Sequence, residues 1–118
     1  MPRLLVVDDQ QDIADVIAMY LSDEGHAVTT AGHGAAALAA LERERFDGAI
    51  VDAVLPGASG LAVAAAASAR GVPVLLMTGE PNSMERLDGE GRYPVLKKPF
   101  HLRELGAALR LLIDSTAA

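Results

Sequence analysis

The sequence contains no cysteine and no tryptophan. The absence of cysteine excludes disulfide bonds, thiolate catalysis and zinc sites built on cysteine. No apolar run approaches the roughly 20 residues that a helix needs to cross a bilayer. The first residues lead directly into a short apolar stretch, without the architecture of a signal peptide. These absences predict a cytoplasmic chain that makes no membrane contact.

Positive charge is also scarce. Lysine and arginine number 10 against 16 aspartates and glutamates, which gives a formal net charge of −6. A surface that binds nucleic-acid phosphates needs clustered lysine and arginine, so we expect no direct nucleic-acid partner. Hydrophobic residues make up 51% of the 118 residues, which is enough for the core of one domain. We therefore expect a single domain over residues 1–118 and no output domain in this chain.

Five short apolar runs alternate with segments of helical character along the chain. The runs cover residues 4–7, 27–30, 48–51, 72–77 and 95–97. The first run is continuous, without alternating polar residues, which is typical of a strand buried on both faces of a sheet. The Pro- and Gly-containing stretch 55–60 is predicted to be a loop. The runs therefore predict five short strands.

Helical patterns fill the gaps between these runs. Apolar residues spaced for one helical face follow the first run: Ile13, Val16, Ile17, Tyr20 and Leu21. Two alanine-rich helices are expected over 32–44 and 61–70, with Leu38 and Leu41 as the larger anchors of the first. A short helix is expected near 83–87. The closing helix carries leucines at spacings of three and four: Leu102, Leu105, Leu109 and Leu112.

Strict alternation of strands and helices predicts an α/β fold, a single-domain doubly wound (βα)5 sandwich around a five-stranded parallel sheet. In such sheets, ligands bind beyond the carboxyl ends of the strands. We expect polar side chains from four strand ends at that edge. They are Asp8 and Asp9 after the first strand, Asp52 after the third, Thr78 after the fourth and Lys98 after the fifth.

Three carboxylates at one edge repel one another and require a cation. Two like unit charges about 4 Å apart repel by about 4 kcal/mol at an effective dielectric constant near 20. Oxygen ligands suit Mg²⁺, with Mn²⁺ as an alternative. An ammonium and a hydroxyl beside them suit phosphate oxygens. The set predicts phosphoryl transfer to a carboxylate, and removal of Asp8 or Asp9 is expected to relieve repulsion in the metal-free protein.

These residues and their spacing resemble the response-regulator receiver family of two-component signalling. The matching pieces cover nearly the whole chain: Val7-Asp8-Asp9, Val51-Asp52 with Leu55-Pro56 and Gly60, Met77-Thr78-Gly79, and Lys97-Lys98-Pro99-Phe100. Each piece alone is weak, but all four in order form a specific signal. The resemblance implies the strand order 2-1-3-4-5.

The resemblance also implies a role for each site residue. Asp52 is the expected phosphoacceptor, and Thr78 and Lys98 are expected to hold the phosphoryl oxygens. Asp9, Asp52 and the backbone carbonyl of Val54 are the expected Mg²⁺ ligands, with Asp8 acting through metal-bound water. A histidine kinase or a histidine phosphotransfer protein is the implied donor, and an unidentified protein is the downstream partner. Such a domain accepts a phosphoryl group and assists its transfer and loss, but it is not an enzyme in its own right.

Two departures from the family's pattern concern the switch. Val95 occupies the position of the family's switch aromatic, and Tyr93 lies two residues earlier. Either residue is open as a participant in the switch. Gly79 occupies a position where alanine is more usual. The chain is either a stand-alone receiver or a part of a larger regulator or hybrid kinase.

Three other interpretations compete with this one. Asp8, Asp9 and Asp52 are also typical turn or helix-capping residues. A Mg²⁺-dependent phosphatase with an aspartyl nucleophile needs a second acid where this chain has Val54. A flavodoxin-like FMN carrier needs a Ser/Thr-rich phosphate loop after the first strand, where Asp8 and Asp9 would repel phosphate. The three histidines are too dispersed for a metal site, and we expect them at the surface or in caps: His26, His33 and His101.

Overall fold

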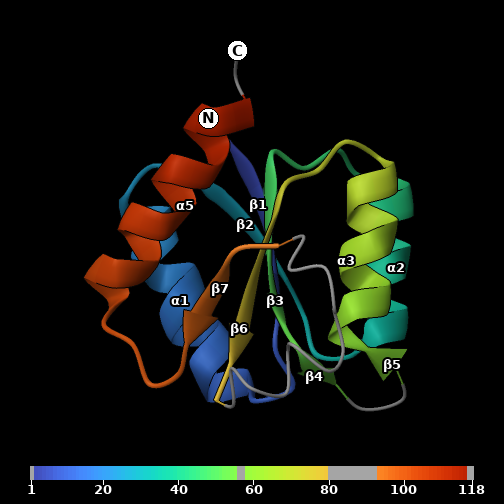
Figure 1. Cartoon of the computed structure of the whole chain (residues 1–118), viewed down its shortest axis with the longest axis horizontal. Helices are drawn as coiled ribbons and strands as arrows, with labels where there is room; N and C mark the ends of the chain where they lie inside the picture. Colours follow the sequence, from blue (N-terminus) through green and yellow to red (C-terminus); the bar gives the residue numbers. More distant parts are fainter. Residues whose placement is uncertain (1, 56–57, 80–92, 117–118) are drawn as a thin grey trace.

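The sheet at the centre of the molecule has five parallel strands (Figure 1). This computed structural model describes residues 2–55, 58–79 and 93–116. The strands are β1 (Arg3–Val7), β2 (Ala27–Ala31), β3 (Gly48–Asp52), β6 (Val74–Thr78) and β7 (Val95–Lys97). Their order is β2-β1-β3-β6-β7, and every pairing is parallel. The α/β fold class is confirmed, and these five strands, counted alone, run 2-1-3-4-5.

Helices cover both faces of the sheet. Figure 1 shows α1 (Gln11–Asp23) and α5 (Leu102–Thr116) on one face, and α2 (Gly34–Arg43) and α3 (Gly60–Ala69) on the other. The short helix expected near residues 83–87 lies outside the described residues. Within the described part of the chain, no helix has the combination of length and apolar character needed to cross a membrane.

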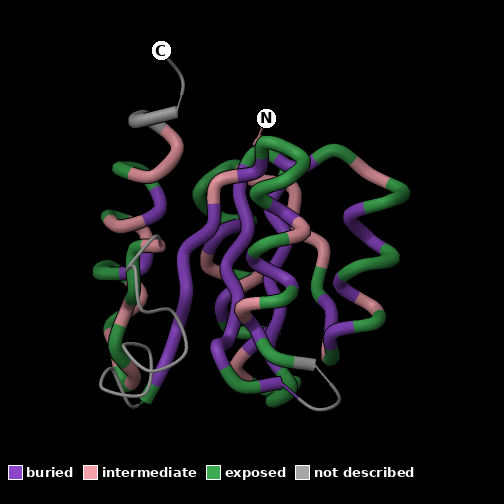
Figure 2. Tube along the Cα trace, turned by 45° about the vertical axis from the view of Figure 1, so that its right-hand side comes forward, coloured by how far each residue is buried: buried purple, intermediate pink, exposed green. Residues whose placement is uncertain are grey.

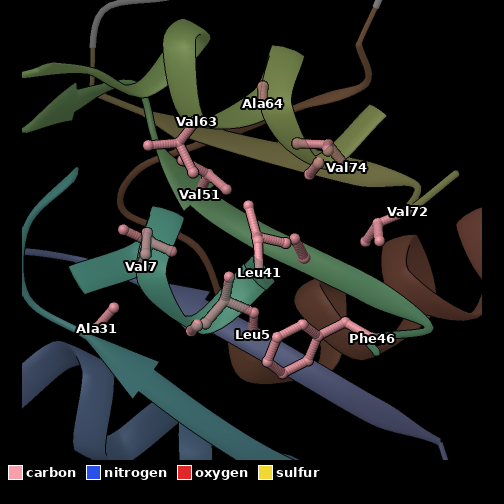
Figure 3. Packing of buried hydrophobic residues seen from close by; sticks show 14 of the residues in the cluster. Leu5, Val7, Ala31, Leu41, Phe46, Val51, Val63, Ala64, Val72 and Val74 are labelled. Atoms are coloured by element: carbon pink, nitrogen blue, oxygen red, sulfur yellow. The ribbon is translucent and has the colours of Figure 1, made fainter. Parts of the chain in front are cut away.

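Alternate residues of each central strand pack into two separate hydrophobic cores, one on each face of the sheet. Successive side chains of a strand point to opposite faces, so neighbours in β1 enter different cores. Leu5 and Val7 join the α2–α3 core with Leu41 and Val63, as Figure 3 shows, whereas Leu4 joins the α1–α5 core. Figure 2 shows the central strands as continuously buried. This double burial is why the strand runs are continuously apolar.

Two of the expected helix anchors are wrong. Leu38 is 37% exposed, and the inner face of α2 is instead formed by Ala37, Ala40 and Leu41. These three recur at i, i+3 and i+4, whereas Leu38 is one position further round the helix. Val16 is 53% exposed for the same reason, because Ile17 carries that turn of α1 into the core.

The stretch expected to be a loop after β3 carries a short antiparallel strand pair, a hairpin whose two central residues lie outside the described ranges. Val54–Leu55 (β4) pairs antiparallel with Ala58–Ser59 (β5), and α3 begins at the next residue. The Ser59 side chain accepts a hydrogen bond from the Ala62 amide and so caps α3. This hairpin returns the chain to the end of β3, so the start of α3 lies beside the last strand residue.

Candidate functional site

Four neighbouring strands deliver polar side chains to one edge of the sheet, at the lower edge of Figure 1. Asp8 follows β1, Asp52 ends β3, and Thr78 ends β6. All three residues are buried, with exposed fractions of 0% for Asp8, 8% for Asp52 and 4% for Thr78. Lys98 follows β7 and is placed by a hydrogen bond of 2.8 Å from its amide to the carbonyl of Thr78. The structure therefore brings together the residues that sequence patterning assigned to this edge.

The three carboxylates form one cluster. One oxygen from each of Asp8, Asp9 and Asp52 lies within 4.8 Å of the other two. Asp8 and Asp52 are buried, whereas Asp9 is exposed at the rim. It is the one cluster of this kind among the described ranges. An arrangement of oxygen ligands with one side open to solvent matches the preference of a hard divalent cation that keeps several water ligands.

Lys98 neutralises part of this cluster. Its Nζ lies 3.0 Å from Asp8 Oδ2 and 3.0 Å from Asp52 Oδ2. Burial on its own lowers the pKa of Lys98, but the hydrogen bonds to Asp52 and Asp8 and their negative charges outweigh burial. The pKa of Lys98 therefore lies above its ordinary value, and the ammonium stays charged at neutral pH. Three carboxylates against one ammonium still leave an excess of negative charge for a metal ion to balance.

Backbone amides orient the two buried carboxylates. The amide of Val54 donates to Asp52 Oδ1 at 3.0 Å, and the amide of Gln10 donates to Asp8 Oδ1 at 2.9 Å. Gln10 is the N-cap residue of α1, so its bond to the side chain two residues earlier is an Asx turn that leads into the helix and does not cap it. Asp8 therefore uses Oδ1 for the bond to the Gln10 amide and Oδ2 for the ion pair with Lys98.

The positions that depart from the family pattern also have definite places. Val95 is 41% exposed on the edge strand β7. Tyr93 is partly buried against the α2–α3 core.

The histidines are not part of the carboxylate cluster. His33 accepts a hydrogen bond from the Ala36 amide and caps α2, and His101 is exposed. His26, the third histidine, is half-buried between α1 and β2.

Asp8→Ala and Asp9→Ala are expected to differ in metal-free stability. Asp8 is fully buried and bonded to Lys98 and to the Gln10 amide, so its removal should lower the free energy of unfolding by about 1–3 kcal/mol. Asp9 is exposed, and its removal should change that free energy by less than about 0.5 kcal/mol. The relief of repulsion expected from sequence therefore applies to Asp9 alone. Thermal unfolding in a chelator measures both, and equal losses in the two variants would contradict this account.

One residue of the site region escaped assignment of a role from sequence. Gly60 belongs to the motif that carried the resemblance, but nothing in the spacing indicated what it contacts. In the structure it lies directly against the backbone of Asp52 and Ala53. The sequence signals were its membership of that motif and its place at the end of the predicted loop 55–60, directly before the helix expected over 61–70.

Comparison with known proteins gives a consistent result. Residues 4–110 match the family described as "Response regulator receiver domain". The "Probable transcriptional regulatory protein TcrX" of Mycobacterium tuberculosis is 38% identical over 117 residues, which are 96% of this chain and 50% of that relative. The chain thus spans about half the length of the curated relatives it matches.

Solved structures show the same similarity. Chemotaxis protein CheY4 of Vibrio cholerae superposes with a TM-score of 0.82 at 31% identity, covering 95% of this chain and 98% of that one. Response regulator protein TrrA of Thermotoga maritima, in complex with Mg²⁺ and BeF, superposes with a TM-score of 0.83 at 30% identity and covers 95% and 99%.

Proposed function

The chain belongs to the response regulator receiver domain family, and from this premise we propose that Asp52 accepts a phosphoryl group from a histidine kinase or histidine phosphotransfer protein. A receiver domain is the part of a two-component response regulator that receives the signal. One observation carries the assignment of Asp52. Its carboxylate lies among the clustered carboxylates and bonds directly to the Lys98 ammonium.

The proposed transfer is an in-line displacement at phosphorus. A carboxylate oxygen of Asp52 attacks, and the bond from phosphorus to the donor's histidine nitrogen breaks, with its electron pair remaining on that nitrogen. Lys98, which bonds Asp52, and Thr78, at the end of the neighbouring strand β6, would bind the phosphoryl oxygens, on which the negative charge is spread. Val54, whose amide bonds Asp52, keeps the carboxylate from rotating away.

The cluster fits Mg²⁺, with Mn²⁺ as the alternative. Asp9, Asp52 and the carbonyl of Val54 would hold the ion directly, and Asp8 would act through bound water. When bound, the ion neutralises the charge of the carboxylates and of the phosphoryl oxygens. Asp8 suits the indirect position, since it is the most deeply buried of the three carboxylates.

The site favours a phosphoacceptor over the competing activities. A phosphatase with an aspartyl nucleophile needs an acid at the position of Val54, whose apolar side chain is 67% exposed beside Asp52. The loop after β1, where an FMN carrier binds phosphate, instead presents Asp8 and Asp9. We therefore propose a signalling domain that assists its own phosphorylation and dephosphorylation. We place this domain in the cytoplasm, without a direct nucleic-acid or membrane partner. The downstream protein that responds to its phosphorylation is unidentified.

The donor's docking surface is expected beside Lys98. A largely apolar groove there is lined by Ile13, Val16, Ile17, Pro99, Phe100 and Leu102, together with the charged residues Asp12 and Lys98. A donor histidine must approach Asp52 closely, so the segment that carries it has to cover the neighbouring surface. Val16→Asp should slow transfer from a protein donor at least about tenfold, because it replaces part of the apolar lining with a second carboxylate beside Asp12. Transfer from a small-molecule phosphodonor should be unchanged.

A matched control for the groove lies on the same helix. Met19 is 67% exposed and does not line the groove. Met19→Asp should therefore leave both kinds of transfer unaltered. Equal slowing by Val16→Asp and Met19→Asp would place the docking surface elsewhere on α1.

The proposed function is tested by offering the purified protein a small-molecule phosphodonor. With Mg²⁺, intact-mass analysis should show a gain of one phosphoryl group, and with a chelator the gain should be lost. An unchanged mass in the presence of Mg²⁺ and donor would refute the proposal. An absorbance spectrum free of flavin bands is the companion measurement against the FMN carrier.

A further inference from the structure

Gly60 has no room for a side chain. It is the first residue of α3 and is buried. A Cβ atom built on it would fall against the carbonyl oxygen of Asp52 and lie 2.7 Å from Ala53 Cα. Real Cβ atoms essentially never approach other atoms within 3.0 Å. The neighbouring atoms are backbone, so no rotamer change can relieve the overlap.

The requirement for glycine at this position is steric, not conformational. Gly25 and Gly71 are the described glycines with positive φ, at 97° and 78°, and both have open space around them. Gly60 is not in that left-handed region, so other residues could adopt its backbone angles. Its missing Cβ instead allows two backbone segments to touch.

The contact at Gly60 is continuous with the phosphoacceptor site. The Gly60 amide donates to the Ala53 carbonyl at 3.0 Å, and the Ala53 amide donates to the Met77 carbonyl at 2.9 Å. The next residue, Val54, donates its amide to Asp52 Oδ1. One backbone unit therefore joins the start of α3, the end of β3 and the carboxylate of Asp52.

The backbone at the end of β3 cannot move away from a side chain at residue 60. β3 lies between β1 and β6 and is buried along its whole length. A side chain at residue 60 would therefore push the other side of the contact, which is the start of α3 and the β4–β5 hairpin. That hairpin begins with Val54, whose carbonyl is a proposed metal ligand and whose amide orients Asp52.

We propose that Gly60 is a positioning residue of the phosphoacceptor site. Its missing side chain lets α3 begin in contact with the end of β3, and this contact determines the position of Val54. The position of Val54 in turn determines the orientation of the Asp52 carboxylate and the place of the carbonyl proposed as a metal ligand. This inference rests on the proposed function of Asp52. Gly60 has no side chain with which to bind a metal ion or a phosphoryl group, so it acts through these neighbours.

Gly60→Ala tests the proposal through metal affinity. Changes in groups that orient metal ligands typically cost about 10- to 100-fold in affinity, and a loss of that size is expected for Mg²⁺ measured by calorimetry. In the metal-free protein, hydrogen exchange at the Val54 amide should be faster, because its bond to Asp52 is weakened. Both measurements are made well below the unfolding temperature, and neither depends on phosphorylation.

Gly48→Ala is the matched control. Gly48 is a buried glycine at the opposite end of the same strand, where a new Cβ would lie 3.2 Å from the movable Leu4 Cδ2. This variant should lose some stability but keep wild-type Mg²⁺ affinity and Val54 exchange. If Gly60→Ala behaves like Gly48→Ala, Gly60 serves the fold alone and the proposal is overturned.

Ser59→Ala covers the case in which Gly60→Ala does not fold. It removes the α3 cap that Ser59 supplies to the Ala62 amide and adds no atoms. The loosened helix start should weaken Mg²⁺ binding in the same direction but less, and unchanged affinity would count against the proposal. Failure of the proposed function is separate, because it would appear as wild-type protein that binds Mg²⁺ but takes up no phosphoryl group.

Discussion

Asp52→Asn is expected to reduce phosphoryl uptake at least about a hundredfold, because an amide cannot replace the carboxylate as nucleophile. The two side chains have nearly the same shape, and the asparagine oxygen can still accept the hydrogen bond from the Val54 amide. Lys98 keeps its other partner, Asp8, at 3.0 Å. The free energy of unfolding should therefore change by no more than about 1–2 kcal/mol. Intact-mass analysis with a small phosphodonor and Mg²⁺ measures the uptake.

Asp23→Asn is the control for this prediction. Asp23 is an exposed carboxylate at the far end of α1 from the site, so the same substitution there should leave uptake at the wild-type rate. One phosphoryl group gained by Asp52→Asn at that rate would show that another residue is the acceptor. Fragment masses of the phosphorylated protein would then identify it.

Lys98→Met is expected to affect metal binding and phosphoryl uptake in opposite directions. The substitution removes a positive charge that lies 3.0 Å from two carboxylates. Mg²⁺ no longer competes with that charge, so its affinity should rise at least about tenfold. Uptake should nevertheless fall by about 10²- to 10³-fold, because a donor to the phosphoryl oxygens is lost. A rise in both quantities would exclude Lys98 from the transfer step.

Lys97→Met supplies the matched control, since Lys97 is the preceding lysine and is exposed on β7. It should change neither quantity. A loss of uptake in Lys97→Met as large as that in Lys98→Met would mean that the two lysines had been assigned in the wrong order.

Metal-free stability as a function of pH gives an independent reading of Lys98. Its pKa in the folded protein lies above the ordinary value of a lysine, near 10.4, so the folded state binds this proton more tightly than the unfolded state. The stability that Lys98 contributes is fully present below the unfolded-state pKa and is lost as the pH rises through the folded-state pKa. Wild-type protein should therefore lose more stability than Lys98→Met between neutral and strongly alkaline pH. Parallel curves for the two proteins would contradict the ion pairs.

The fold class was predictable because burial determines the pattern of apolar residues within each strand and helix separately. A strand such as β1, covered on both faces, must be apolar at every position, and the alternation of such runs with helical patterns specifies a parallel sheet. Chain direction in that sheet then places Asp8, Asp52, Thr78 and Lys98 at one edge. The candidate site therefore followed from local patterns and one rule of topology.

Side-chain position around a helix was less predictable. Leu38 was expected inside and lies outside, because the alanines of α2 pack closely enough that small residues form the buried face. Size and hydropathy alone favour leucine for the core. The choice depends on how closely the helix approaches the sheet, which no local pattern specifies.

By itself, the sequence determined the α/β class, the parallel sheet and the set of residues at its edge, because periodicity and strand ends are local properties of the chain. Only the tertiary structure decided that Lys98 pairs with both Asp8 and Asp52, that the Val54 amide orients Asp52, and that Gly60 touches the end of β3. The Lys98 pairs join segments far apart in the chain, whereas the Val54 and Gly60 contacts depend on how the chain turns after β3. These contact distances depend on the packing of the whole domain, and residue spacing along the chain does not encode them.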